Sequence, residues 1–222
     1  YAVHIQLMDQ GVLPEHILVS GIPVRKSLYE RLDKEDAKRH LGLTPDCRHL
    51  LIMGGSMGCG PIPQLLEVLS SVAGQDIEIS VICGNNGNLY RELFDEYRSF
   101  DRIHLYGFVQ DISLMMDCAD LLLTKPGGIS TTEAAVKRLP MVLVNAVAGC
   151  EAYNLSFFVG SGGAVSAETE HELAESCLRL LHDDKGRTAM AQALERIILG
   201  NNREVIYSAM KLLSERNCVW TA

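Results

Sequence analysis

The stretch ADLLLTKPGGISTTEAAV, residues 119–136, is the most informative part of this chain. Its apolar start predicts a buried strand that breaks at Pro126-Gly127-Gly128, and a helix is expected to follow. A strand that turns directly into a helix leaves unpaired backbone N–H groups at the positive end of the helix dipole, which favours an anion. Glu133, one turn further on, can accept hydrogen bonds from a pair of neutral hydroxyls. Diphosphate and ribose together describe a nucleotide, so the stretch predicts a nucleotide-linked ligand.

Outward from this stretch, short apolar runs alternate with segments of helical period. Strands are expected over residues 16–20, 49–53, 77–82, 102–106, 121–124, 141–145 and 164–166. Helices are expected over residues 62–73, 89–100, 112–118, 130–137, 152–159, 168–182, 186–199 and 203–215. Nearly continuous apolar strands alternating with helices predict an α/β fold, a Rossmann-like parallel sheet with helices on both faces. Ligands of such sheets bind beyond the carboxyl ends of the strands, so the loops that follow strands are the candidate sites.

Composition narrows the class of protein. With 222 residues, 47% of them hydrophobic and 22% charged, the chain is expected to be an ordinary soluble globular protein with a sizeable core. A net charge of −8 argues against broad electrostatic binding to nucleic acid or to anionic lipid. The seven cysteines are scattered without a CxxC or metal-ligand spacing, which predicts reduced thiols and no metal site. No run reaches the length of a membrane span, and no signal peptide is visible.

The first residues do not fit the strand-and-helix alternation. Residues 1–26 are interpreted as the tail of a preceding domain followed by a hinge at Gly21-Ile22-Pro23-Val24-Arg25. Residues 27–222 are expected to form the ligand-binding domain. The chain begins without a Met in helix-like sequence, so we expect it to be a piece of a longer protein.

Three further loops follow predicted strands. The glycine-rich loop around Gly54–Gly58 allows backbone N–H groups to approach a phosphate, although it fits neither a dinucleotide fingerprint nor a P-loop. The alternative is a simple tight turn. Gly107-Phe108-Val109 can form a base pocket with backbone groups and an apolar wall, or it is an ordinary strand exit with a buried Phe.

The last of these loops carries Glu151 and Asn154, which can bind sugar hydroxyls. Glu151 and Glu133 have a plainer interpretation as helix-start carboxylates that interact with the helix dipole. Together, four such loops at one end of a parallel sheet predict a nucleotide-sugar site more strongly than any single loop does.

Five motifs in order carry a resemblance to a known family: GIPVR (21–25), GGSMG (54–58), GFV (107–109), PGGISTTE (126–133) and EAYN (151–154). Together they resemble the C-terminal, donor-binding half of glycosyltransferase family 28. That family includes the murein GlcNAc transferase, monogalactosyldiacylglycerol synthase and the processive diacylglycerol glucosyltransferases. The sequences TKPGG (124–128) and GCEAYN (149–154) are most similar to those of the diacylglycerol enzymes. The resemblance implies a GT-B fold, with two Rossmann-like domains facing a cleft, and metal-independent, inverting transfer.

The same resemblance implies roles for the matched positions. The backbone at Phe108 and Val109 would hold uracil, and Glu133 the ribose diol. Four positions at the helix start would hold the diphosphate: Pro126, Gly127, Gly128 and Ile129. The glycine-rich loop would face the diphosphate and sugar through Gly55, Ser56, Met57 and Gly58. Glu151 and Asn154 would bind sugar hydroxyls or the β-phosphate, and Arg25 would stabilise the leaving group.

The reaction implied is transfer of a hexose from UDP-glucose or UDP-galactose to diacylglycerol, without a cofactor. The catalytic base is expected in an acceptor domain that this chain lacks, so none is assigned and the chain alone is expected to transfer nothing. A cytoplasmic protein peripheral to the inner face of the membrane, without nucleic-acid partners, is implied. The alternatives are a murein GlcNAc transferase, a non-catalytic nucleotide-sugar-binding subunit, and a UDP-sugar epimerase.

Overall fold

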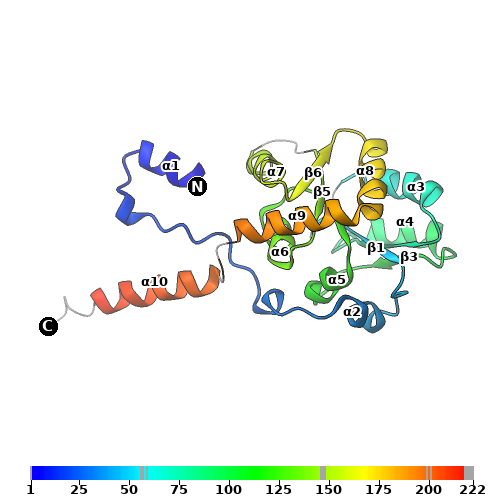
Figure 1. The fold of residues 1–222 in the computed structure, drawn as a ribbon, viewed down its shortest axis with the longest axis horizontal. Helices are drawn as coiled ribbons and strands as arrows, with labels where there is room; N and C mark the ends of the chain where they lie inside the picture. The colour runs from blue at the N-terminus through cyan, green and yellow to red at the C-terminus, as the bar shows by residue number, and fades with distance from the viewer. Residues whose placement is uncertain are drawn as a thin grey trace. The chain divides into compact units, whose positions relative to one another are not determined.

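A computed structural model describes residues 2–55, 58, 60–145, 149–198, 200 and 202–217. The chain divides into two compact units. Arg25–Ile198 form the larger unit, which contains all the described strands (Figure 1). The described residues before Arg25 and after Ile198 form the smaller one.

The larger unit is built on a six-stranded parallel sheet in the order β3-β2-β1-β4-β5-β6. The strands are β1 (Arg48–Met53), β2 (Ile77–Ile82), β3 (Ile103–Tyr106), β4 (Leu121–Thr124), β5 (Met141–Val144) and β6 (Ala164–Ala167). The predicted α/β, Rossmann-like class is confirmed. Strand order reverses between β1 and β4, and this is the point where doubly wound sheets bind ligands. Met53 at the end of β1 pairs with Thr124 at the end of β4, so the loops that follow the two strands start side by side.

Helices cover both faces of the sheet (Figure 1). They are α2 (Lys34–His40), α3 (Ile62–Val72), α4 (Gly87–Tyr97), α5 (Ile112–Cys118), α6 (Gly128–Lys137), α7 (Cys150–Gly160), α8 (Glu170–His182) and α9 (Asp184–Ile197). A 3₁₀ turn, η2 (Lys26–Tyr29), precedes α2. Right-handed crossovers carry the chain outward through α3 and α4 and back through α5, which puts α5 and α6 on the opposite face from α3.

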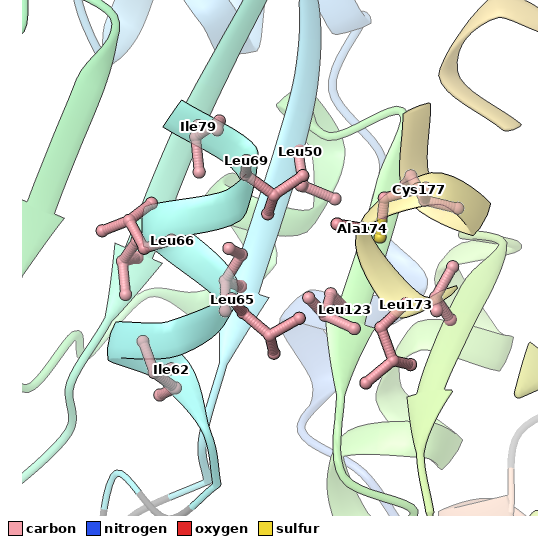
Figure 2. Packing of buried hydrophobic residues seen from close by; sticks show 14 of the residues in the cluster. Leu50, Ile62, Leu65, Leu66, Leu69, Ile79, Leu123, Leu173, Ala174 and Cys177 are labelled. Atoms are coloured by element: carbon pink, nitrogen blue, oxygen red, sulfur yellow. The ribbon is translucent and has the colours of Figure 1, made fainter. Parts of the chain in front are cut away.

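The main core lies between the sheet and the α3, α4 and α8 helices. Leu65 and Leu69 of α3 face Leu50 of β1, and Leu123 of β4 lies between them and Leu173 of α8 (Figure 2). All five side chains are at most 2% exposed. Burying each leucine contributes roughly 2 kcal/mol of transfer free energy. This core therefore stabilises the sheet, and the loops that leave its carboxyl edge start from fixed positions.

A buried ion pair fixes the far end of α6. Lys137 Nζ lies 2.7 Å from Asp117 Oδ1, and it also donates to the carbonyl of Glu30 at 2.5 Å. The side chains of Lys137 and Asp117 are 1% and 6% exposed, so each charge depends on the other for compensation. This pair ties α6 to α5 and to the segment before α2.

The smaller unit contains α1 (Ala2–Asp9), the 3₁₀ turn η1 (Pro14–His16) and α10 (Asn202–Asn217). The buried Asn202 donates from Nδ2 to the carbonyl of Ile22 at 3.0 Å, which joins the two segments of this unit. None of the described helices is both long and apolar enough to cross a lipid bilayer.

Most predicted elements form within two residues of their expected bounds; α4, expected to end at residue 100, ends three residues earlier at Tyr97. Two larger differences concern one strand and one helix. The strand predicted over residues 16–20 is wrong: Pro14 starts a helical turn that ends at His16, and no described strand lies beside it to pair with. Helix α2 was not expected. Its signal was present, because Asp33 caps it by accepting from the N–H groups of Glu35 and Asp36.

Candidate functional site

The predicted site residues of the larger unit gather at the carboxyl edge of the sheet. The loops after β1, β3, β4 and β5 all leave this edge because the strands are parallel. Ser56 and Met57, two of the predicted positions, lie outside the described residues. The others can be placed.

The start of α6 presents backbone donors to solvent. Gly127 occupies the N-cap position and has no side chain to cap the helix. The hydroxyls of Thr131 and Thr132 donate to the carbonyls of Gly127 and Gly128, at 2.7 and 2.6 Å, and not to an N–H group. The first-turn N–H groups are therefore left uncapped by these side chains, and with the helix dipole they favour an anion such as a phosphate.

Glu133 lies one turn inside α6 and is 9% exposed. The plainer interpretation of Glu133 as a helix-start carboxylate in solvent therefore does not hold, because its side chain is buried. Burial raises the pKa of Glu133 above its usual value, and the positive charge of Arg25 opposes this shift. A buried carboxylate keeps its charge best when donors reach it, and the two hydroxyls of a ribose are such donors.

Arg25 reaches the same edge from the segment before α2. Its Nη1 donates to the carbonyl of Gln110 at 2.9 Å, in the loop that follows β3. Arg25 thus lies between the β3 loop and Glu133, which are far from it in the sequence. A guanidinium there adds positive charge beside the start of α6.

The glycine-rich loop after β1 makes a tight approach to the end of β2. Gly55 and Gly58 have φ angles of +72° and +57°, in the left-handed region that favours glycine. A Cβ on Gly58 would lie 2.5 Å from the carbonyl oxygen of Cys83. The loop can follow this path only with glycine at that position.

Phe108 is 59% exposed, and Val109 beside it is half-buried. The alternative interpretation of Phe108 as a buried strand-exit residue is therefore wrong. An exposed aromatic ring at the ligand-binding edge of the sheet offers an apolar face that a planar base can cover. Ile129, at the start of α6, is also exposed, at 65%.

Two polar contacts join the loop after β4 to helix α7, which follows β5 in the chain. Lys125 Nζ lies 2.9 Å from Glu151 Oε1 at the start of α7. Asn154 donates from Nδ2 to the carbonyl of Pro126 at 3.0 Å. Glu151 is thus an ion-pair partner rather than only a helix-start carboxylate. The sequence reasoning missed Lys125, although a lysine directly between a strand end and Pro-Gly-Gly was the available signal.

Lys125 and Glu151 line a cavity of about 320 Å³. Its other walls are Gly60, Pro61, Val144, Asn145, Glu168, Glu170 and Leu173. Two larger cavities, of about 380 and 340 Å³, lie away from the loops described above. One of them is lined by Ile77 and Ile103, which begin β2 and β3, so it opens at the amino end of the sheet. Position relative to the strands, rather than size, identifies the cavity beside Lys125 as the candidate site.

Within the part of the chain that the structure describes, no three His, Cys, Asp or Glu side chains are grouped so as to hold a metal ion. The described polar groups at this edge include the backbone donors of α6, the cations of Arg25 and Lys125, and four carboxylates, those of Glu133, Glu151, Glu168 and Glu170. This set suits a ligand that combines an anion with neutral hydroxyls.

Residues 62–196 match the family described as "Glycosyl transferases group 1". The processive diacylglycerol beta-glucosyltransferase of Bacillus licheniformis is 33% identical over 203 residues, covering 90% of this chain and 52% of the relative. The enzyme of the same name from Bacillus subtilis is 30% identical, covering 90% and 53%. The chain therefore spans about half the length of these curated relatives. The predicted similarity to processive diacylglycerol glucosyltransferases is confirmed.

Solved structures share the fold at low identity. A putative UDP-N-acetylglucosamine 2-epimerase from Listeria monocytogenes superposes with a TM-score of 0.70 at 19% identity, covering 96% of this chain and 57% of its own. HepE of Anabaena, solved in complex with UDP and glucose, gives 0.67 at 16% identity, covering 95% and 60%. The lipopolysaccharide glycosyltransferase WaaG gives 0.65 at 20% identity, covering 84% and 53%.

Proposed function

Because this chain belongs to the group 1 glycosyl transferases, we propose that it is the donor-binding half of an enzyme that transfers a hexose to diacylglycerol. The donor is UDP-glucose or UDP-galactose, and the product is a membrane glycolipid. Residues 1–26 are the end of an acceptor domain and the hinge, and residues 27–222 bind the donor. The names of the curated relatives support the lipid acceptor. We further propose the family 28 type of reaction, inverting and independent of metal.

The observation that carries this proposal is the pairing of an uncapped helix start with a buried carboxylate one turn further along α6. Backbone N–H groups at Gly128 and Ile129 suit a diphosphate, and Glu133 suits the ribose diol. Both lie beside the reversal of strand order in the sheet. The complex of HepE with UDP and glucose, on the same fold, supports a donor of this kind.

In the proposed reaction a hydroxyl oxygen of diacylglycerol attacks the anomeric carbon of the hexose, and the bond from that carbon to the diphosphate breaks. The attacking hydroxyl loses its proton to a base outside this chain. Negative charge grows on the departing UDP, and fixed donors at the α6 start stabilise it most when the bond is breaking. Arg25 would add to this stabilisation through its charge.

Loops that hold the base and the sugar complete the proposed donor site. Phe108 and Val109 contact uracil, and Glu151 and Asn154 contact the hexose. The glycine-rich loop faces the diphosphate. The whole enzyme would be a cytoplasmic protein that acts peripherally at the inner face of the membrane, where its lipid acceptor lies.

The experiment that tests the donor site is calorimetric titration of the chain with UDP and with 2′-deoxy-UDP. Glu133→Ala is expected to weaken UDP binding about tenfold, since a hydrogen bond to a charged group contributes about 1.5 kcal/mol or more. The wild type should prefer UDP to 2′-deoxy-UDP, and the variant should bind the two equally. Glu92→Ala, which removes an exposed carboxylate from α4, is the matched control.

Absence of UDP binding, or a Glu133→Ala variant that still prefers UDP to its deoxy analogue, would contradict the proposed site. The chain alone is expected to bind donor and transfer nothing. Tighter competition by UDP-GlcNAc than by UDP-glucose would favour a murein-type enzyme. Conversion of a UDP-sugar without any acceptor would favour an epimerase.

A further inference from the structure

Lys125 lies between the two glycine turns that the proposed function assigns to the diphosphate. A Cβ placed on Gly55 would lie 3.2 Å from Lys125 Cε, and a Cβ on Gly127 would lie 3.8 Å from the same atom. The lysine stem therefore passes beside the glycine-rich loop on one side and the α6 start on the other. A larger residue at Gly55 or Gly127 would reduce the space that the Lys125 side chain occupies.

The ammonium of Lys125 ends at the candidate cavity, 2.9 Å from Glu151 Oε1. The side chains of the pair are 37% and 26% exposed, so a ligand in the cavity can reach both. Lys125 is the only basic side chain among the described residues that line this cavity. Glu168 and Glu170 line it as well, so the cavity wall carries more negative than positive charge.

We propose that Lys125 is the side-chain cation that binds the donor diphosphate, and that its ion pair with Glu151 couples recognition of the diphosphate to recognition of the sugar. This inference rests on the proposed function, which it deepens by assigning a residue that neither the motifs nor the comparisons assign. In the empty site the two charges satisfy each other. When a diphosphate enters, one of the three ammonium donors of Lys125 turns to a phosphate oxygen. Glu151 still holds the ammonium through Oε1 and has further lone pairs, on its two oxygens, for a hydroxyl of the hexose.

The coupling has a consequence for the order of recognition. A neutral sugar without a diphosphate can donate to Glu151 but makes no contact with the charge of Lys125, so it is expected to bind weakly. A donor that carries both groups gains both contacts at once. Charge on the departing UDP also grows during the reaction, so Lys125 stabilises the breaking bond more than the bound donor.

The test uses calorimetric titration of the 222-residue chain with uridine, UDP and UDP-glucose. Lys125→Ala is expected to weaken UDP binding about tenfold while leaving uridine binding unchanged. Lys125→Arg keeps the charge and should restore UDP binding to within about threefold of the wild type. Lys185→Ala, at an exposed position of α9, is the matched control and should bind all three ligands as the wild type does.

Glu151→Gln separates the two parts of the proposal. The substitution removes the negative charge that competes with a diphosphate for Lys125, so UDP should bind as tightly as to the wild type or more tightly. UDP-glucose should lose its advantage over UDP. In the double variant Lys125→Ala/Glu151→Gln, the changes in binding free energy of the two single variants should not add, because each substitution removes the same ion pair.

Three results would overturn the inference. They are unchanged UDP binding by Lys125→Ala, equal weakening of uridine and UDP, and strictly additive effects in the double variant. If the wild type binds UDP and Glu133→Ala weakens it, but Lys125→Ala does not, this inference fails while the proposed function stands. If the wild type binds no UDP, both fail.

Discussion

At the scale of the residue, His49 shows how the sheet interior sets a side chain's chemistry. His49 on β1 is 1% exposed, and its Nε2 lies 2.8 Å from Ser80 Oγ on β2. Its Nδ1 lies 3.4 Å from Cys118 Sγ. Burial lowers the pKa of His49 to about 3, although the nearby carboxylate of Asp120 opposes that shift. The imidazole of the folded protein is therefore expected to be neutral at pH values well above 3.

This neutrality predicts how stability depends on pH. Below pH 6.5 the unfolded chain protonates His49 while the folded chain does not, so the unfolded state binds more protons and stability falls as pH falls. Between pH 7 and pH 5 the loss should be about 2 kcal/mol. Urea unfolding at several pH values measures it. His49→Gln should flatten the slope, and the exposed His171→Gln should leave it as it is.

An unchanged slope in His49→Gln would show that the imidazole is not held neutral. Titration of the Asp120 carboxyl does not contribute to the dependence of stability on pH within this window. Its pKa lies below the usual value, because Lys34 and a backbone N–H outweigh its burial. Its contribution is therefore lost only at pH values below the window.

Glu133 and Lys125 mark the limit of prediction at this scale. A carboxylate one turn inside a helix could be assigned to a ribose from its motif, but only the packing of α6 shows that it is buried. The role of Lys125 could not be predicted from the sequence, because a helix and a strand separate it from its partner Glu151 along the chain. Charge pairing between loops depends on which strands are neighbours, and that is a property of the sheet.

At the scale of the element, the loop between β1 and α3 depends on one glycine. Gly58 has a positive φ angle, and a Cβ there would lie 2.5 Å from the carbonyl oxygen of Cys83, 2.9 Å from Cβ of Asn86 and 3.2 Å from Leu89. Backbone cannot move aside as a flexible side chain can. The loop and the start of α4 are therefore locked together.

Gly58→Ala is expected to destabilise the protein by about 2 kcal/mol or more, since strain in the left-handed region adds to the clash. It should also weaken UDP binding, because the glycine-rich loop must move. Urea unfolding and calorimetry measure the two effects. Gly87→Ala at the start of α4 is the control: nothing lies within 4 Å of its Cβ position, and it should be neutral or stabilising.

If Gly58→Ala unfolded at the same urea concentration as the wild type, the tight approach to β2 would be contradicted. The elements themselves were largely predictable. Strand β2 (Ile77–Ile82) and helix α5 (Ile112–Cys118) have the bounds expected from their apolar patterns. The failures, the strand at residues 16–20 and helix α2, lie outside the alternation of strand and helix, where neighbouring elements give no support.

At the scale of the whole molecule, the division into units predicts which part folds and binds. Arg25–Ile198 contain the complete sheet and both helix layers, and the buried pair of Lys137 and Asp117 lies within them. A chain of residues 25–198 is therefore expected to fold. Its melting temperature should lie within about 4 °C of that of the full chain, which corresponds to roughly 1 kcal/mol.

Circular dichroism gives the melting temperature, and UDP titration of the same sample tests whether the site survives. Lys137→Ala in the shorter chain is the comparison, because it leaves the Asp117 charge buried and should cost about 3 kcal/mol or more. A chain of residues 25–198 that fails to fold, or melts far below the full chain, would show that the larger unit depends on the segments removed.

Local patterns in the sequence predict the α/β class, most element bounds and the loops at which we expect a ligand to bind. Those features follow from local patterns: apolar runs make strands, helical periods make helices, and parallel strands send their loops to one edge. Only the tertiary structure decided which side chains meet there. Arg25 reaches the edge that holds Glu133, Lys125 pairs with Glu151, and Phe108 stays exposed because strand order, not sequence order, sets the neighbours of each loop.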